Sequence, residues 1–229
     1  MTISWSDYVS WTHETAMRRA DKDTEPRELA ELLIIWGLGL GGEFAEFMVE
    51  MLGVTQGTAR DFVNQDFSAK AREEAGDVLW YLARLYQDTG NALHEASAPR
   101  LATLREVASA VKDVVECLKK ALRKEGRAGL IRLTISESEQ QKIYDPSIKM
   151  EKIGLSGRRE EFGVLLDRAL STFEAWLVAR GSSLSEVCEL NQEKLRARKA
   201  EGTISVQGER LGELLNEKVG IPMPRRSDG

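Results

Sequence analysis

Apolar residues recur at helical spacing along most of this 229-residue chain, in stretches separated by short polar or glycine-containing breaks. Residues at positions i, i+3, i+4 and i+7 lie on one face of a helix, so such stretches predict amphipathic helices. The sequence therefore predicts an all-α fold, a helical bundle. The expected helices cover residues 5–20, 27–52, 68–88, 101–124, 159–179 and 185–200.

Glycine and serine residues mark where these helices are expected to be interrupted or to end. Four glycines fall within residues 37–42, and each costs a helix about 1 kcal/mol relative to alanine. They predict either a junction between two helices or a close approach of the backbone to a neighbouring segment. Gly90 suits a left-handed residue at a helix end, and Ser68 and Ser182 or Ser183 are expected to cap helix starts.

Two stretches lack helical periodicity. Residues 126–158 contain glycines, an Asp-Pro pair and mixed polar sequence, which predict an irregular insertion with a short hairpin at residues 130–135. The C-terminal tail over residues 206–229 ends in Pro-Met-Pro-Arg-Arg-Ser-Asp-Gly, and from Asn216 onward it is expected to be frayed.

Composition and charge indicate a soluble protein from a reducing compartment. Hydrophobic residues make up 42% of the chain and charged residues 30%, and the two cysteines, Cys117 and Cys188, are too few for a disulfide framework. A net charge of -5 shows no basic excess for nucleic-acid binding. The uncharged run over residues 32–40 is shorter than the roughly 20 residues of a membrane span, and no leader pattern opens the chain. We therefore expect a cytoplasmic protein that binds neither nucleic acid nor membrane.

The most informative side chains are acids at helical spacing. Glu43 and Glu46 stand three residues apart, and Glu74 and Asp77 repeat that spacing in the next expected helix, with Glu73 beside them. Apolar residues surround both pairs, so the carboxylates would repel one another strongly unless a cation lay between them. Carboxylate oxygens suit Mg²⁺ or Mn²⁺, and Mg²⁺ characteristically shares its ligand shell with substrate phosphates.

The sequence allows two other interpretations of these acids. An E-x-x-E pair is common on a solvated helix, where it is ordinary surface charge. A di-iron bundle also uses paired carboxylates, but it needs Glu-x-x-His on two helices. The histidines, His13 and His94, are not at those positions, which disfavours the di-iron interpretation.

Three strings of residues carry a resemblance to a known family. They are G-E-F-A-E at 42–46, A-R-E-E-A-G-D-V-L-W-Y-L-A at 71–83 and N-Q-E-K-L-R-A-R at 191–198. Together they resemble the all-α nucleoside triphosphate pyrophosphohydrolases of the MazG type. The mark of that family is E-x-x-E, a gap, E-x-x-D and a closing N-x-x-K-L-x-x-R helix, so the resemblance implies a helical bundle of the same type.

The resemblance implies hydrolysis of a nucleoside triphosphate between its α- and β-phosphates, giving a monophosphate and pyrophosphate. The cofactor that it implies is Mg²⁺, with Mn²⁺ as an alternative. The metal ligands that it implies are Glu43, Glu46, Glu74 and Asp77. Glu73 is the candidate catalytic residue, either as the base on the attacking water or as an outer-sphere ligand.

The closing helix supplies the residues expected to bind the substrate. Lys194 and Arg198 are four residues apart on one helix face, and we expect them to hold the phosphates. Asn191 is expected to bond to the sugar or the base. Lys194 and Arg198 could also be a solvated basic stripe, and Asn191 an ordinary surface residue.

The closing motif lies unusually far from the G-D-V-L-W string, which predicts an internal duplication. In a second run of sequence, residues 113–120 resemble 43–50, and residues 159–163 resemble 72–76. In that register Val164 stands where the acid of E-x-x-D is expected; a second alignment puts Asp167 there, but Val164 then replaces the glutamate. The second E-x-x-D is incomplete either way. The dimeric dUTPases show the same kind of asymmetric doubling.

The duplication predicts a catalytic half over residues 1–100, a degenerate half over 101–205 that contains the insertion 126–158, and the tail 206–229. We therefore expect either a pseudo-dimer within one chain or a homo-oligomer, with a dimer as the simplest case. The alternative function is that of a non-catalytic nucleotide-binding or helical interaction protein derived from the same fold. A purely structural helical scaffold is a third interpretation.

Overall fold

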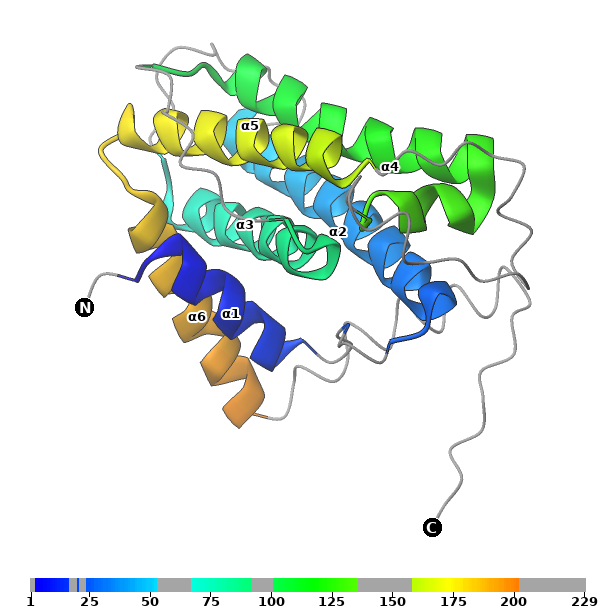
Figure 1. Ribbon diagram of the computed structural model, residues 1–229. Coiled ribbons are helices and arrows are strands. Elements are labelled where there is room, and N and C mark those ends of the chain that lie inside the picture. Colours follow the sequence, from blue (N-terminus) through cyan, green and yellow to red (C-terminus); the bar gives the residue numbers. More distant parts are fainter. Residues whose placement is uncertain are drawn as a thin grey trace. The chain divides into compact units, whose positions relative to one another are not determined.

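A computed structural model describes residues 3–16, 20, 24–52, 67–91, 101–135 and 158–201, and it confirms the all-α prediction (Figure 1). Every regular element in these ranges is a helix. The helices are α1 (Trp5–Thr15), α2 (Pro26–Leu52), α3 (Ala69–Thr89), α4 (Leu104–Arg132), α5 (Arg159–Val178) and α6 (Leu184–Ala200). The expected tail, residues 206–229, lies outside the described residues.

The chain divides into two compact units, residues 1–191 and 192–229. Within the first unit, α2 packs on α3 and α4, α4 also packs on α5, and α3 contacts α1 and α5. One hydrophobic core joins these helices. Phe47 of α2, Leu79 of α3 and Val114 of α4 all belong to it and are fully buried.

Local signals at the helix ends behave as the sequence predicts. The Ser68 hydroxyl accepts a hydrogen bond from the backbone N–H of Ala71 at 3.0 Å and so caps α3. Gly90 ends α3 in the left-handed conformation, with φ of 63°. The Ser183 hydroxyl accepts from the backbone N–H of Glu186 at 3.1 Å, at the start of α6. The structure confirms these caps. They were predictable from the sequence because each depends on residues within one helical turn.

The glycines of residues 37–42 do not separate two helices, because α2 is continuous through them. The junction prediction was wrong, whereas the close approach is confirmed at two positions. A Cβ at Gly37 would lie 2.7 Å from Cδ1 of Leu118 on α4, and a Cβ at Gly39 would overlap the Tyr81 ring on α3. Glycine therefore lets two neighbouring helices reach the α2 backbone.

The short hairpin predicted at residues 130–135 was also wrong. Helix α4 continues to Arg132, beyond the expected end at residue 124, and bends at Gly126, where φ is 63° and ψ is -147°. Beyond the bend, Leu130 and Leu133 are both buried. A helical spacing of three residues places both side chains in the core, whereas an alternating strand would place them on opposite faces. The remainder of the predicted insertion, residues 136–157, lies outside the described residues.

Helix α2 is long and apolar enough, by length and composition alone, to cross a membrane. The uncharged run over residues 32–40 did not predict this, because it is shorter than the roughly 20 residues of a membrane span. Leu33 and Leu40 of α2 are fully buried within the hydrophobic core, and 33% of the apolar window of α2 is buried.

Candidate metal centre

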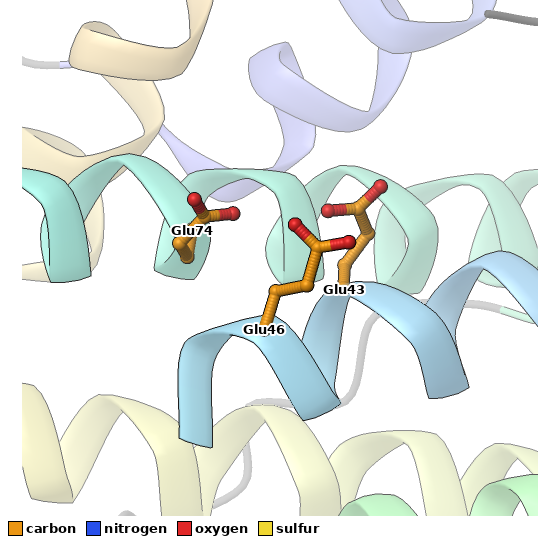
Figure 2. Close-up of side chains that lie close together, drawn as sticks. All are labelled: Glu43, Glu46 and Glu74. Carbon is orange, nitrogen blue, oxygen red and sulfur yellow. The ribbon is translucent and has the colours of Figure 1, made fainter. Parts of the chain in front are cut away.

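Three carboxylates from two helices gather between α2 and α3. Glu43 and Glu46 extend from α2 and Glu74 extends from α3, and Figure 2 shows the three side chains close together across the helix pair. One carboxylate oxygen from each residue lies within 4.8 Å of the others. Glu43 and Glu74 are half-buried and Glu46 is exposed. We call these three residues the acid cluster.

Two contacts fix the register in which α2 and α3 pack side by side. At one end, Gly39 makes room for the Tyr81 ring; at the other, the Lys70 ammonium lies 2.6 Å from Oε1 of Glu50. The contacts are eleven residues apart in each helix, from 39 to 50 and from 70 to 81. They bracket the acid cluster and bring the E-x-x-E of α2 opposite the E-x-x-D of α3.

Asp77 is the one predicted metal ligand outside the 4.8 Å grouping. It lies one turn beyond Glu74 on α3 and is half-buried. Its Oδ1 accepts a hydrogen bond from Nδ2 of Asn191 at 2.8 Å. The structure thus brings three of the four predicted ligands together and pairs the fourth with an amide from α6.

Lys70 is a charged neighbour of the acid cluster that the sequence interpretation missed. The hydrogen bond and the charge of Glu50 raise the pKa of the Lys70 ammonium, and the charges of Glu74 and Glu46 raise it further. A positive charge therefore lies at the exposed edge of the carboxylates. The available signal was its spacing, because Lys70 precedes Glu74 by four residues on the same helix.

Tyr81 is a second neighbour that the sequence interpretation missed. Burial raises the pKa of its phenol to about 12, and the charges of Glu43 and Asp77 add to this effect. Its hydroxyl is consequently neutral at physiological pH. The ring packs against Trp80, with centroids 5.0 Å apart, and against Trp36 at 6.1 Å. Tyr81 follows Asp77 by four residues, which again is the spacing that could have identified it.

The other predicted site residues have different surroundings. Glu73 is exposed and lies outside the acid cluster. Asn191 is only 1% exposed, and both ends of its amide make hydrogen bonds within the first unit. Lys194 and Arg198 are partly buried residues of α6 that belong to the second unit. Their part in phosphate binding stays a prediction.

The chemistry of the acid cluster fits a hard divalent cation. It offers carboxylate oxygens from two helices, which is the ligand type that Mg²⁺ and Mn²⁺ prefer. A cation held there would offset the mutual repulsion of the three charges. The exposure of Glu46 leaves one side of the cluster open to water and to a bound anion.

Comparison of the chain with protein-family models, with curated proteins and with solved structures finds no match. The case for a function therefore depends on the motifs and on the geometry of the residues themselves.

Proposed function

We propose that this protein is a metal-dependent nucleoside triphosphate pyrophosphohydrolase of the MazG-like type. It adds water to the α-phosphorus of a nucleoside triphosphate and releases a nucleoside monophosphate and pyrophosphate. The observation that carries the proposal is the acid cluster, because Glu43, Glu46 and Glu74 of the E-x-x-E and E-x-x-D motifs meet in space. Paired motifs of this kind would otherwise be ordinary surface charge on separate helices.

The residues of the acid cluster hold Mg²⁺, with Mn²⁺ as an alternative, and Asp77 completes the ligand set. A divalent cation bound there would neutralise phosphate charge and would lower the pKa of a water molecule bound to it. Glu73 acts on the attacking water, as its base or through an outer-sphere contact. Being exposed, Glu73 is reached by solvent without movement of the fold.

Four residues are expected to contact the triphosphate as positive or neutral donors. Lys194 and Arg198 bind the phosphates, arginine through a forked contact and lysine as a point charge. Lys70 provides a further positive charge beside the acid cluster. The neutral Tyr81 hydroxyl adds a hydrogen-bond donor that carries no negative charge to repel a triphosphate.

We also propose that the chain is a tandem duplication whose first half keeps the acids. Two observations support this. Helices α4 and α5 pack together as α2 and α3 do. In addition, Gly76 and Gly163, which occupy matching places in the two E-E-x-G strings, each closely approach an asparagine side chain, Asn191 and Asn91 respectively. The duplication makes the chain a pseudo-dimer, which we expect to be cytoplasmic and able to assemble into a homo-oligomer.

The test is pyrophosphate release from a panel of ordinary, deoxy and damaged nucleoside triphosphates, measured with Mg²⁺, with Mn²⁺ and with excess chelator. The proposal predicts release that requires the metal and a ranking of substrates that names the preferred base. Metal-dependent nucleotide binding without release would instead favour the non-catalytic nucleotide-binding protein. Absence of both binding and release would leave a structural scaffold.

A further inference from the structure

A buried chain of hydrogen bonds leads from α1 through α6 to Asp77. The Tyr8 hydroxyl donates to Oδ1 of Asn191 at 2.8 Å, and Nδ2 of Asn191 donates to Oδ1 of Asp77 at 2.8 Å. Tyr8 is 0% exposed and Asn191 is 1% exposed. Three helices that are distant in sequence thus meet at one carboxylate, and water has little access to the bonds between them.

The direction of these hydrogen bonds is fixed by chemistry. An amide can present either its oxygen or its NH₂ group to a neighbour, whereas an ionised carboxylate can only accept hydrogen bonds. Burial raises the pKa of the Tyr8 phenol well above its usual value, with smaller contributions from Cys188 and Asp77, so Tyr8 stays a donor. Because the Asp77 carboxylate accepts, the NH₂ group of Asn191 must face Asp77, and the amide oxygen accepts from the Tyr8 hydroxyl.

Gly76 makes the contact between α3 and α6 possible. A Cβ at this position would lie 2.8 Å from Cβ of Asn191, which is closer than side-chain carbons approach in proteins. The glycine precedes Asp77 directly, so α6 reaches α3 at the place where the carboxylate extends. Glycine here is a requirement of the hydrogen-bond chain as well as of helix packing.

We infer that Tyr8 and Asn191 are positioning residues for Asp77, which together orient its carboxylate toward a divalent cation held by the acid cluster. This inference rests on the proposed function. Outer partners that orient a ligand commonly change metal affinity when they are removed. Asn191 is thereby assigned to Asp77, in place of the contact with sugar or base that the family resemblance implies.

The experiment titrates Mn²⁺ into the full-length protein, with free Mn²⁺ followed by electron paramagnetic resonance, and measures kcat at saturating Mn²⁺. The variants are Asn191→Leu, which removes both amide groups, and Tyr8→Phe, which removes one hydroxyl. Tyr86→Phe is the matched control, because the buried Tyr86 hydroxyl donates to Oδ1 of Asp167 at 2.6 Å, away from the acid cluster. Circular dichroism establishes that each variant is folded at the assay temperature.

We expect Asn191→Leu to weaken Mn²⁺ binding roughly 10–100-fold, and Tyr8→Phe to weaken it by a smaller factor of about three- to tenfold. Excess Mn²⁺ should restore kcat in both variants, which a general loss of structure would not allow. Tyr86→Phe should bind Mn²⁺ as the wild type does. Equal Mn²⁺ affinity in Tyr8→Phe and Tyr86→Phe would overturn the positioning role while leaving the proposed function intact. A wild-type protein that binds no Mn²⁺ would overturn the proposed function, and the positioning role with it.

Discussion

The helix pairs α2–α3 and α4–α5 carry acids at matching positions, but these acids have different neighbours. In α2–α3, Glu43, Glu46 and Glu74 face one another. In α4–α5, the corresponding acids are each engaged by a basic side chain. These ion pairs are Asp113 with Arg168 at 3.2 Å, Glu116 with Lys119 at 2.5 Å, and Glu161 with Arg158 at 2.9 Å.

Part of the difference originates in the residues that follow Glu46 and Glu116 along the sequence. Glu116 precedes Lys119 and Lys120, which are within reach on the same helix, whereas residues 47–52 after Glu46 include no basic residue. Exposed ion pairs contribute only about 0–1 kcal/mol each, but they neutralise the acids locally. Acid spacing alone therefore does not mark a metal site, because the matching acids of α4–α5 are held in ion pairs.

The largest effect is expected when one acid is removed from each helix pair, which tests whether the two sets of acids differ in function. Glu46→Gln deletes a ligand charge at almost constant size, and we expect metal-dependent turnover to fall by about a hundredfold or more. Glu116→Gln is the matched control on α4 and should retain wild-type turnover. Pyrophosphate release measures both. Equal losses in the two variants, or no loss in either, would contradict the assignment of the site to α2–α3.

The register of α2 against α3 can be tested with two alanine substitutions. Gly39→Ala places a methyl group into the Tyr81 ring and should destabilise the fold by roughly 1–3 kcal/mol. Gly41→Ala meets open space and should stabilise it by up to about 1 kcal/mol, because alanine favours the helix. Urea unfolding gives both free energies. If Gly39→Ala were as stable as Gly41→Ala, the close approach would be wrong.

The raised pKa of Tyr81 should make the unfolding free energy depend on pH in the alkaline range. Its pKa is raised to about 12, whereas an unfolded tyrosine ionises near pH 10. The folded state thus favours the neutral phenol, and this contribution to stability is complete below about pH 10 and is lost as the pH rises toward 12. When the pH is raised from about 9 to about 11.5, the unfolding free energy of the wild type should fall by more than that of Tyr81→Phe. The expected difference between the two decreases is about 2 kcal/mol. Equal losses in urea titrations would indicate an exposed phenol.

The smallest effect is expected from the closing helix, which the second half contributes. Lys194→Ala should raise the KM for the triphosphate by about tenfold and leave kcat nearly unchanged, as the loss of one charge-assisted contact predicts. Lys199→Ala, an exposed neighbour on α6, is the control and should keep the wild-type KM. A KM that does not change in Lys194→Ala would remove this residue from the phosphate site.

Periodicity and capping residues predicted all six described helices, but not the ends of α1 and α4. Ser68 and Gly90 end α3 through local hydrogen bonds and backbone conformation, which sequence neighbours determine. The role of the α2 glycines could not be decided from the sequence. It depends on side chains of α3 and α4, which occupy the space where a Cβ would lie. The hairpin prediction failed for a similar reason, since burial of Leu130 depends on tertiary packing.

The candidate site was predictable in its acids but not in its geometry. Helical spacing placed Glu43 beside Glu46 and Glu74 beside Asp77, but no local rule states which residue of α2 faces which residue of α3. That register comes from the Tyr81 ring and the Lys70 ammonium. The hydrogen-bond partner of Asp77 was not predictable either, because Asn191 lies more than a hundred residues away in sequence.

A crystal structure of the protein with Mn²⁺, in which anomalous scattering locates the ion, would test the proposed metal site at atomic detail. We expect a peak between α2 and α3 with ligand oxygens from Glu43, Glu46, Glu74 and Asp77, and none beside Asp113 and Glu116. A peak at α4–α5, or no peak at the acid cluster under saturating Mn²⁺, would contradict it.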